Sequence, residues 1–335
     1  MVIGDISPST PNYLLDLIGS VYNPALYLTL VYAIEAVDLV KRFVGYERIG
    51  FIKKRKTVVE ALKGLSLRVN WHEVYGLLGP NGAGKTTTVK ILSTLLIPDS
   101  GYALVDGHDV VKEASAVRRA IGLVLYPDKG FYSRLSGFEN LVYFGRLYGL
   151  SKRDAEARAR ELLGLMGLED SMNRPYEEYS LGMRARLAIA RALIHDPPVV
   201  FLDEPTIGLD PISAREVRRL IRDLRGEGKA VLLTSHNLWE VEEVCDRVGI
   251  ISHGRVIIEG SPRDIKERLG FKYVVELEVE RDGKVEVVRE ESRDPVTTLR
   301  RLMDQFTGDG YRISRVRINE PSLEEAFVRV VSNER

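Results

Sequence analysis

The feature that most constrains what this chain can fold into is a glycine-rich stretch, GPNGAGKTT, at residues 79–87. It fits the pattern G-x-x-x-x-G-K-[ST]; a short apolar strand, EVYGLLG, precedes it and a helix, GKTTTVKILSTLL, follows. Between a strand and a helix, this pattern is specific for a loop that wraps phosphate groups. The alternative, an ordinary glycine turn, is disfavoured by that context. The stretch therefore predicts a phosphate-binding site.

The chemistry of this loop follows from its residue types. Gly79, Gly82 and Gly84 leave space for backbone N–H groups to surround the phosphates. Lys85 can reach the β- and γ-phosphates, and the Thr86 hydroxyl can hold Mg²⁺.

Two further strand ends supply groups that such a site needs. VVFLDEP ends in Asp203, a candidate for the Mg²⁺ shell, and Glu204, which would orient or deprotonate the attacking water. AVLLTSH ends in His236, whose imidazole could hydrogen-bond the γ-phosphate. Strands often end in a solvated acid, and a lone strand-end histidine is usually a surface residue. Only their order after the glycine-rich loop favours the catalytic interpretation.

Composition excludes several classes of protein. The chain has 335 residues with 48 basic and 48 acidic side chains, so its net charge gives no indication that it binds nucleic acid or an anionic membrane. The single cysteine, Cys245, cannot form an internal disulfide, which fits a reducing cytosol. Residues 17–34 are uncharged, but Asn23-Pro24 interrupts them, so we expect an amphipathic arm rather than a membrane anchor. With no other candidate span, we expect that the chain cannot cross a bilayer alone.

Hydrophobic periodicity predicts the organisation of the chain. Short apolar strands alternate with amphipathic helices, which indicates a mostly parallel sheet covered on both faces. Strands are expected at 32–41 and 58–69 with a basic loop between them, and residues 114–180 are expected to be mainly helical. Strict alternation after Gly270 predicts a small α+β domain.

A second helix start also suits an anion. YSLGMRARLAIARAL at 179–193 begins with a Ser-x-Gly turn and continues into a basic helix. A plain N-cap at Ser180 is the alternative. The stretch lies about a hundred residues beyond the first phosphate loop, across the helical segment, so it can hardly close on its own site.

The ordered set GPNGAGKTT, YSLGM, VVFLDEP, IGLD and TSH resembles the nucleotide-binding subunit of an ABC transporter over residues 32–265. The resemblance implies a P-loop NTPase fold of ABC type, with a mostly parallel sheet, an antiparallel β part and a helical signature subdomain at about 114–180. Around it we expect an N-terminal extension at 1–31 and the small α+β domain at 271–335. The resemblance also implies an ATPase that uses ATP and Mg²⁺. The implied ATP-binding residues are Phe43, Gly79, Pro80, Asn81, Gly82, Ala83, Gly84, Lys85, Thr86, Thr87, Ser180 and Gly182.

In this family two subunits form a head-to-tail dimer, in which the signature of one copy caps the ATP held by the other. The resemblance therefore places Ser180 and Gly182 against the ATP that Lys85 of a second copy holds. Leu181 and Met183 depart from the common Ser-Gly-Gly-Gln signature, and Asp210 in IGLD lies on the loop along the interface. The implied interface residues are Ser180, Leu181, Gly182, Met183 and Asp210.

This chain lacks one residue of the family pattern and offers three candidates for another. The usual glutamine between P-loop and signature is missing from IGLVLYPDKGFYSRL, where Asp128 could replace it as a water-mediated metal ligand. For the aromatic that stacks on adenine, Phe43, Tyr46 and Phe51 compete, and we favour Phe43.

The tail, PSLEEAFVRVV, and the stretch FYSRLSGFENLVYFGRLYGL are similar to ATPases that pair with permeases of the drug-resistance and sodium-efflux kind. The resemblance implies export through a separate integral-membrane permease, with this subunit at the cytoplasmic face of the membrane. The C-terminal segment could instead only brace the subunit or its dimer. The rival function, a soluble ABC ATPase acting on nucleic acid or ribosomes, usually has two cassettes or a long coiled coil, and this chain has neither.

Overall fold

The computed structural model describes residues 32–49, 53–125, 129–320, 322–324 and 327, without the side chains of 46–49 and 53–56. The expected N-terminal extension, the Tyr126-Pro127-Asp128 segment and Phe51 lie outside this description. No helix in the described ranges has the length and apolar character that a membrane span requires.

A six-stranded sheet forms the centre of the molecule, in the order β10-β9-β3-β8-β7-β6. All neighbours pair in parallel except β10, which runs antiparallel to β9. The central strands are fully buried apolar runs, as expected for a parallel sheet covered on both faces. The strands are β3 (Val74–Leu78), β6 (Ile121–Val124), β7 (Val199–Asp203), β8 (Ala230–Ser235), β9 (Arg247–Ser252) and β10 (Arg255–Gly260).

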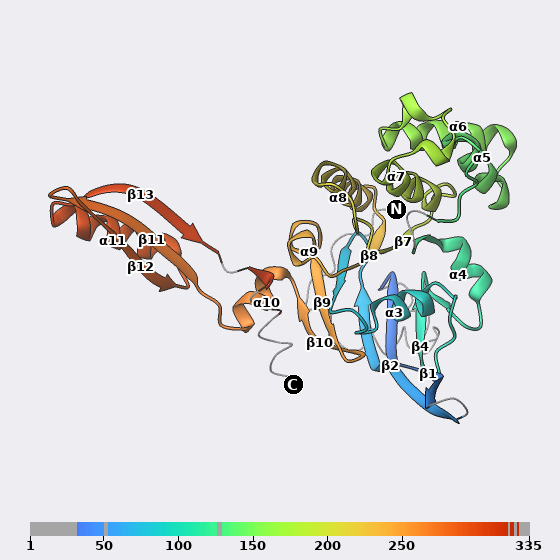
Figure 1. The fold of residues 1–335 in the computed structure, drawn as a ribbon, viewed down its shortest axis with the longest axis horizontal. Helices are drawn as coiled ribbons and strands as arrows, with labels where there is room; N and C mark the ends of the chain where they lie inside the picture. The colour runs from blue at the N-terminus through green and yellow to red at the C-terminus, as the bar shows by residue number, and fades with distance from the viewer. Residues whose placement is uncertain (1–31, 50–52, 126–128, 321, 325–326, 328–335) are drawn as a thin grey trace, which may run out of the picture.

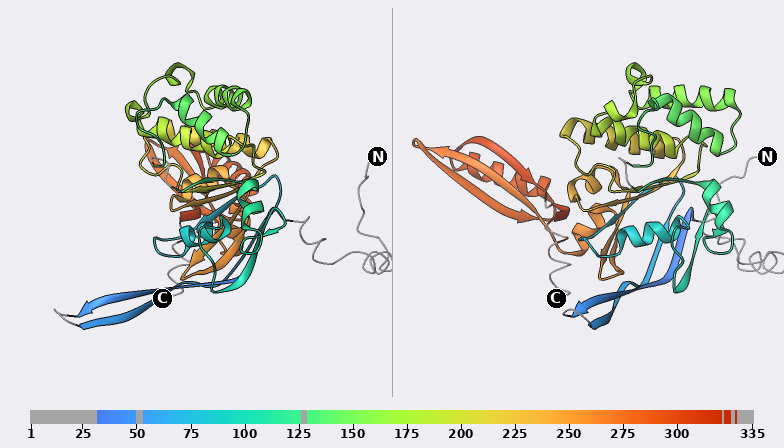
Figure 2. Two further views of the ribbon diagram at one scale, coloured as in Figure 1. Left: turned by 90° about the vertical axis from the view of Figure 1, so that its right-hand side faces the viewer. Right: turned by 45° about the vertical axis from the view of Figure 1, so that its right-hand side comes forward.

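A second, antiparallel sheet has the order β2-β1-β4-β5. Its strands are β1 (Ile34–Ile49), β2 (Lys53–Val69), β4 (Ser100–Val105) and β5 (His108–Asp109). The prediction of a basic loop between the first two strands is wrong, because the β1–β2 ladder continues to the Ile49↔Lys53 pair. β-Branched residues such as Val44, Val58 and Val59 favour strand in this stretch. The result is a long hairpin that projects from the body (Figure 2).

Helices cover both faces of the six-stranded sheet. Alternate strand residues face opposite ways: Phe201 packs with α3 and the antiparallel sheet, whereas Leu202 packs with the helices of the other face. The helices of this part are α3 (Lys85–Leu92), α4 (Ala114–Ala120), α5 (Gly137–Leu147), α6 (Lys152–Leu165), α7 (Leu181–Ala192), α8 (Pro211–Gly226), α9 (Leu238–Val244) and α10 (Pro262–Arg268), with short 3₁₀ turns at Glu169–Ser171 and Tyr176–Glu178. The helices α5, α6 and α7 gather at one end (Figure 1).

The C-terminal part has its own small sheet, β12-β11-β13, which lies to one side of the body (Figure 1). Its elements are β11 (Tyr273–Arg281), β12 (Lys284–Ser292), α11 (Pro295–Gly308) and β13 (Arg312–Asn319). Val275, Leu277, Val279 and Leu302 form a separate hydrophobic core beneath α11. Beyond β13 the chain returns, and Leu323 is buried in the core of the main body.

Candidate nucleotide site

Three neighbouring parallel strands deliver the candidate residues to one edge of the central sheet. β3 leads into the glycine-rich loop, β7 ends at Asp203, and β8, which lies between them, ends directly before His236. The carboxyl ends of parallel strands are where ligands bind in open α/β sheets. Residues far apart in the sequence are therefore neighbours here.

The backbone of the glycine-rich loop has space only for glycine at two positions. A Cβ atom at residue 79 would lie 2.4 Å from the carbonyl oxygen of Ile251, and one at residue 84 would lie 2.8 Å from that of Ala61. Gly84 also has a φ of 115°, a conformation that other residues rarely adopt. The loop is thus held tightly against the body, and α3 begins directly after it.

Lys85 begins α3, and its side chain is buried against the loop. Its Nζ donates to the carbonyl of Gly79 at 2.7 Å and to that of Pro80 at 3.3 Å. The same nitrogen lies 3.5 Å from Oε1 of Glu204. The ammonium group is therefore fixed between the loop and the end of β7.

Asp203 is held by two hydroxyl groups. Thr86 Oγ1 donates to Asp203 Oδ2 at 2.9 Å, and Thr234 Oγ1 donates to Oδ1. Burial raises the pKa of this carboxyl, and the two hydroxyl donors oppose that shift. Thr234, in the TSH sequence before His236, is a site residue that sequence reasoning missed. It also accepts from the backbone N–H of Glu204 at 3.2 Å.

Glu204 and His236 form a close pair. His236 Nδ1 lies 2.7 Å from Glu204 Oε2, and the backbone N–H of His236 donates to the same oxygen at 3.3 Å. Glu204 has a φ of 51°, which is uncommon for a residue other than glycine and is typical of functional sites. The turn after β7 therefore directs this carboxylate toward the end of β8.

These groups line a cavity of about 440 Å³. Its walls combine the glycine-rich loop, the Glu204–His236 pair and an apolar side from β2 and the loop after Glu204. The lining residues are Val59, Ala61, Pro80, Asn81, Gly82, Gly84, Lys85, Thr86, Thr87, Glu204, Ile207 and His236. Val59, Ala61 and Ile207 were not expected from the sequence, because only the fold brings them here.

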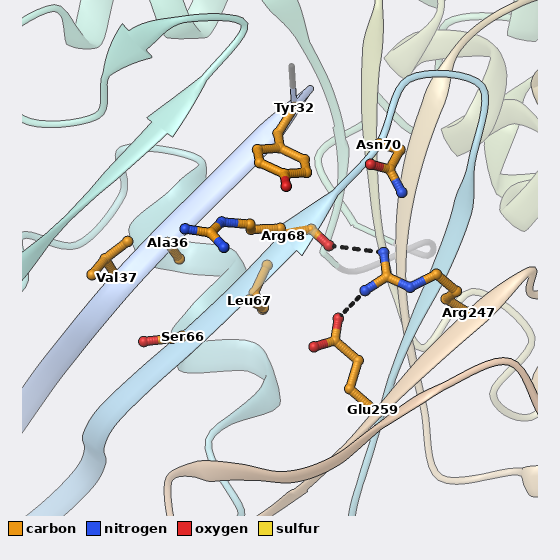
Figure 3. Close-up of a pocket in the computed structure, with 9 residues that line it drawn as sticks. All are labelled: Tyr32, Ala36, Val37, Ser66, Leu67, Arg68, Asn70, Arg247 and Glu259. Atoms are coloured by element: carbon orange, nitrogen blue, oxygen red, sulfur yellow. Dashed lines mark hydrogen bonds and ion pairs between the residues drawn. The ribbon is translucent and has the colours of Figure 1, made fainter. Parts of the chain in front are cut away.

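A second cavity, of about 460 Å³, lies between β1, β2 and the β9–β10 hairpin (Figure 3). Its arginines are already neutralised: Arg68 pairs with Glu35, and Arg247 pairs with Glu73 and Glu259. The nucleotide cavity also has paired groups, since Lys85 and His236 both lie beside Glu204, but its wall contains the glycine-rich loop, whose backbone N–H groups can bind phosphate. Size alone therefore does not identify the site.

The signature residues do not line the nucleotide cavity of their own chain. Ser180 is exposed and caps α7 by accepting from the backbone N–H of Met183 at 3.2 Å. Gly182 is buried, and a Cβ there would lie 2.2 Å from Ser213 Oγ at the start of α8. Asp210 caps α8 through the N–H groups of Ile212 and Ser213, which hold its pKa below the ordinary value.

Exposed apolar residues surround this second region. Leu181 is 42% exposed, Ile207 53% and Ile212 74%. Apolar residues that cluster on a surface indicate a site of protein contact. These exposed apolar side chains are compatible with an interface at the signature.

Phe43 lies beside the cavity, on β1, where it pairs with Val59 of β2. Directly paired residues share one face of a sheet, and Val59 lines the cavity, so Phe43 is on the face that adenine stacking would require. Its side chain is 42% exposed. The side chains of Tyr46 and Phe51, the competing aromatics, lie outside the described part of the chain, as does Asp128.

The oxygen atoms of Thr86 and Asp203 fit a magnesium ion. Mg²⁺ prefers hard oxygen ligands and is usually held by one or two protein side chains together with substrate phosphates. No larger group of potential metal ligands occurs among the described residues. Two protein oxygens leave the other positions around such an ion to phosphate oxygens and water.

Comparison with known proteins gives one consistent family. Residues 62–207 match the family model described as ABC transporter. The chain is 42% identical to the daunorubicin resistance ATP-binding protein DrrA3 of Streptomyces coeruleorubidus over 300 residues, 84% of this chain and 95% of that one. It is 44% identical to the ABC transporter ATP-binding protein NatA of Bacillus subtilis over 213 residues, 64% and 87% of the two chains. A solved dimer of an ATP-binding cassette in a post-hydrolysis state with ADP and phosphate aligns with a TM-score of 0.58 at 25% identity, over 68% of this chain and 98% of that one.

Proposed function

The chain belongs to the ABC transporter family as an ATP-binding subunit, and on that premise we propose that it powers export through a separate membrane permease by ATP-driven closure of a dimer. The observation that carries the proposal is the division of the motifs. The phosphate loop, Glu204 and His236 share one cavity, whereas Ser180 and Gly182 lie outside it. A complete site then needs a second copy.

In this mechanism the chain's own groups bind and orient the reactants. Backbone N–H groups of residues 79–87 and the Lys85 ammonium hold the phosphates. Glu204 accepts a proton from, or orients, the attacking water, and His236 fixes Glu204 through the 2.7 Å contact. The imidazole also lines the cavity where the γ-phosphate would lie.

Mg²⁺ is the proposed cofactor, held by the Thr86 hydroxyl and the Asp203 carboxylate. When bound, the ion neutralises charge on the phosphates. Thr234 keeps the Asp203 carboxylate oriented because it donates to Oδ1. Thr86 lies closer to the other oxygen, at 2.9 Å from Oδ2 against 3.3 Å from Oδ1. Asp128 remains a candidate water-mediated ligand.

The second copy is proposed to supply Ser180 and Gly182 to the ATP held by Lys85. Leu181 and Ile212 are exposed around the signature and would be buried in such a dimer, and Asp210 would lie along the interface. The dimeric ATP-binding cassette that aligns with this chain supports the arrangement. Two ATP molecules and their metals then join the halves, and hydrolysis restores repulsion.

The relatives support the permease partner and the location that we propose. Proteins named for daunorubicin resistance favour an exporter type, and NatA is named as the ATP-binding protein of an ABC transporter. We therefore expect this chain at the cytoplasmic face of the membrane, bound to the permease. The exposed aromatic side chains of Tyr132, Tyr143 and Tyr148 on or beside α5 offer a surface for that partner.

The test is the Glu204→Gln variant. It retains the size of the side chain but not the base, so we expect turnover to fall at least ~100-fold while ATP still binds. Gel filtration with Mg-ATP should then show a stable dimer, and the parent chain should show turnover and a monomer once ATP is consumed. A parent without turnover, or a variant that stays monomeric with ATP, would contradict the mechanism. Association with ribosomes instead of with a membrane protein would contradict transport.

A further inference from the structure

We propose that Glu240, a buried acid on α9, is a positioning residue that holds the strand end that carries His236. This inference rests on the proposed function and adds to it a residue that orients the catalytic pair from outside the cavity. None of the motifs from the sequence includes Glu240.

Glu240 closes a ring of hydrogen bonds around His236. Ser235 Oγ donates to Glu240 Oε2 at 2.9 Å, and the N–H of Asn237 donates to Ser235 Oγ at 3.0 Å. Asn237 Oδ1 in turn accepts from the backbone N–H of Glu240 at 3.2 Å and caps α9. Both neighbours of His236 are therefore tied to Glu240, while the imidazole itself is exposed to the cavity.

The environment of Glu240 is unusual for an acid. Its side chain is 1% exposed, and no hydrogen-bond partner is found for Oε1 among the described residues. A buried polar atom without a partner costs about 1–3 kcal/mol, so it requires a reason. A role in holding the strand end beside His236 supplies that reason.

The printed contacts of Glu240 lead to the end of β8. Burial raises the pKa of Glu240, and the Ser235 hydroxyl, 2.9 Å from Oε2, opposes that shift and holds the carboxylate beside His236.

The consequence is that Glu240 determines where His236 lies. Its carboxylate holds Ser235 and its backbone N–H holds the Asn237 side chain, so it fixes the chain on both sides of the imidazole. Loss of these contacts would change the geometry of the 2.7 Å pair of His236 and Glu204.

The experiment compares Glu240→Leu, Glu240→Gln and Ser235→Ala with the parent chain in steady-state ATP hydrolysis. A small misplacement at a catalytic pair costs on the order of 100-fold, so we expect Glu240→Leu to lower kcat by about that factor with an unchanged KM for ATP. Glu240→Gln keeps an acceptor for Ser235 and should recover most of the loss. Ser235→Ala removes the same contact from the other side and should also lower kcat, which covers the case that Glu240→Leu does not fold.

A second measurement separates positioning from a merely structural role. If Glu240 acts through His236, the double variant His236→Ala/Glu240→Leu should be no slower than His236→Ala alone. The matched control is Glu73→Gln, which alters another buried acid that pairs with Arg247 far from the site, and it should keep the parent kcat.

Two outcomes would overturn the inference alone: a parent-like kcat for Glu240→Leu, or additive losses in the double variant. A parent chain without any Mg-ATP turnover would instead remove the proposed function and this inference with it.

Discussion

His195 shows how a half-buried side chain gives the chain a pH dependence outside the candidate nucleotide site. Its ring stacks on Tyr148 with 3.7 Å between centroids, and Nε2 contacts the carbonyl of Ile121 at 3.0 Å. Burial lowers the pKa of His195, so the unfolded chain binds the proton more readily. The neutral His195 ring therefore contributes to folding stability above the ordinary histidine pKa of about 6.5. This contribution is lost as the pH falls below that value.

We expect His195→Phe to remove this loss while it keeps the stacking. At pH 8 the variant should be less stable than the parent by about 1 kcal/mol, because it loses the hydrogen bond between the ring and the carbonyl of Ile121. Between pH 7 and pH 5 the parent should lose melting temperature more steeply than the variant. Thermal unfolding followed by circular dichroism at several pH values measures both, and equal slopes would refute the assignment.

Residues that line the candidate site could be predicted where the signal is local. The spacing of GPNGAGKTT names Lys85 and Thr86 without knowledge of the fold, and the structure places both in one cavity with Glu204 and His236. Thr234 and Glu240 could not be found this way, because only the pairing of β7 with β8 and the start of α9 bring them to the site. Their residue types are common, and their meaning depends on neighbours distant in sequence.

The contact between the helix starts of α7 and α8 gives a prediction at the scale of elements. A Cβ at residue 182 would lie 2.2 Å from Ser213 Oγ and 2.7 Å from Ser213 Cβ. Gly182→Ala should therefore push the two helices apart, with a cost of about 1–3 kcal/mol in stability and a loss of dimer formation. Ser213→Gly should restore both in the double variant.

Gly226, in the last turn of α8, is the matched control for this change. A Cβ there meets nothing within 4 Å, so Gly226→Ala should stabilise the chain by about 0.5–1 kcal/mol through helix propensity. Chemical denaturation measures the stability of all three variants. An equal effect at residues 182 and 226 would mean that the helix contact carries no strain.

Elements with a clear period were predictable, and those with mixed signals were not. The buried runs of β3, β7 and β8 were evident as apolar stretches, whereas the basic residues between Val44 and Thr57 indicated a loop. The structure continues the ladder there, because antiparallel pairing between two adjacent strands needs no buried face on either side. A run of charged residues can also form a strand, so charge alone does not predict a loop.

At the scale of the whole molecule, the small C-terminal core is separate from the cores on the two faces of the central sheet, and a short return of the chain connects it to the main body. Lys266 of α10 is buried and its Nζ bonds Glu242 of α9 and Glu320, which follows β13. The backbone N–H of Leu323 donates to the other oxygen of Glu242 at 3.2 Å. Both ends of the small C-terminal sheet are thus fastened to one place on the main body, a few residues beyond His236.

Separate cores predict separate unfolding transitions, which tests the proposed division at residue 271. Leu302 lies in the small core and Leu323 in the main one, and each is nearly inaccessible to water. Leucine-to-alanine changes in cores cost about 2–5 kcal/mol, so Leu302→Ala should weaken only the small domain and Leu323→Ala only the main body. In scanning calorimetry, ATP should raise the transition of the main body alone, since only the folded main body binds it. The opposite outcome is one shared transition that both variants and ATP move together. It would mean that the C-terminal part folds as an extension of the cassette, with the segment around Leu323 as a continuation of the main core.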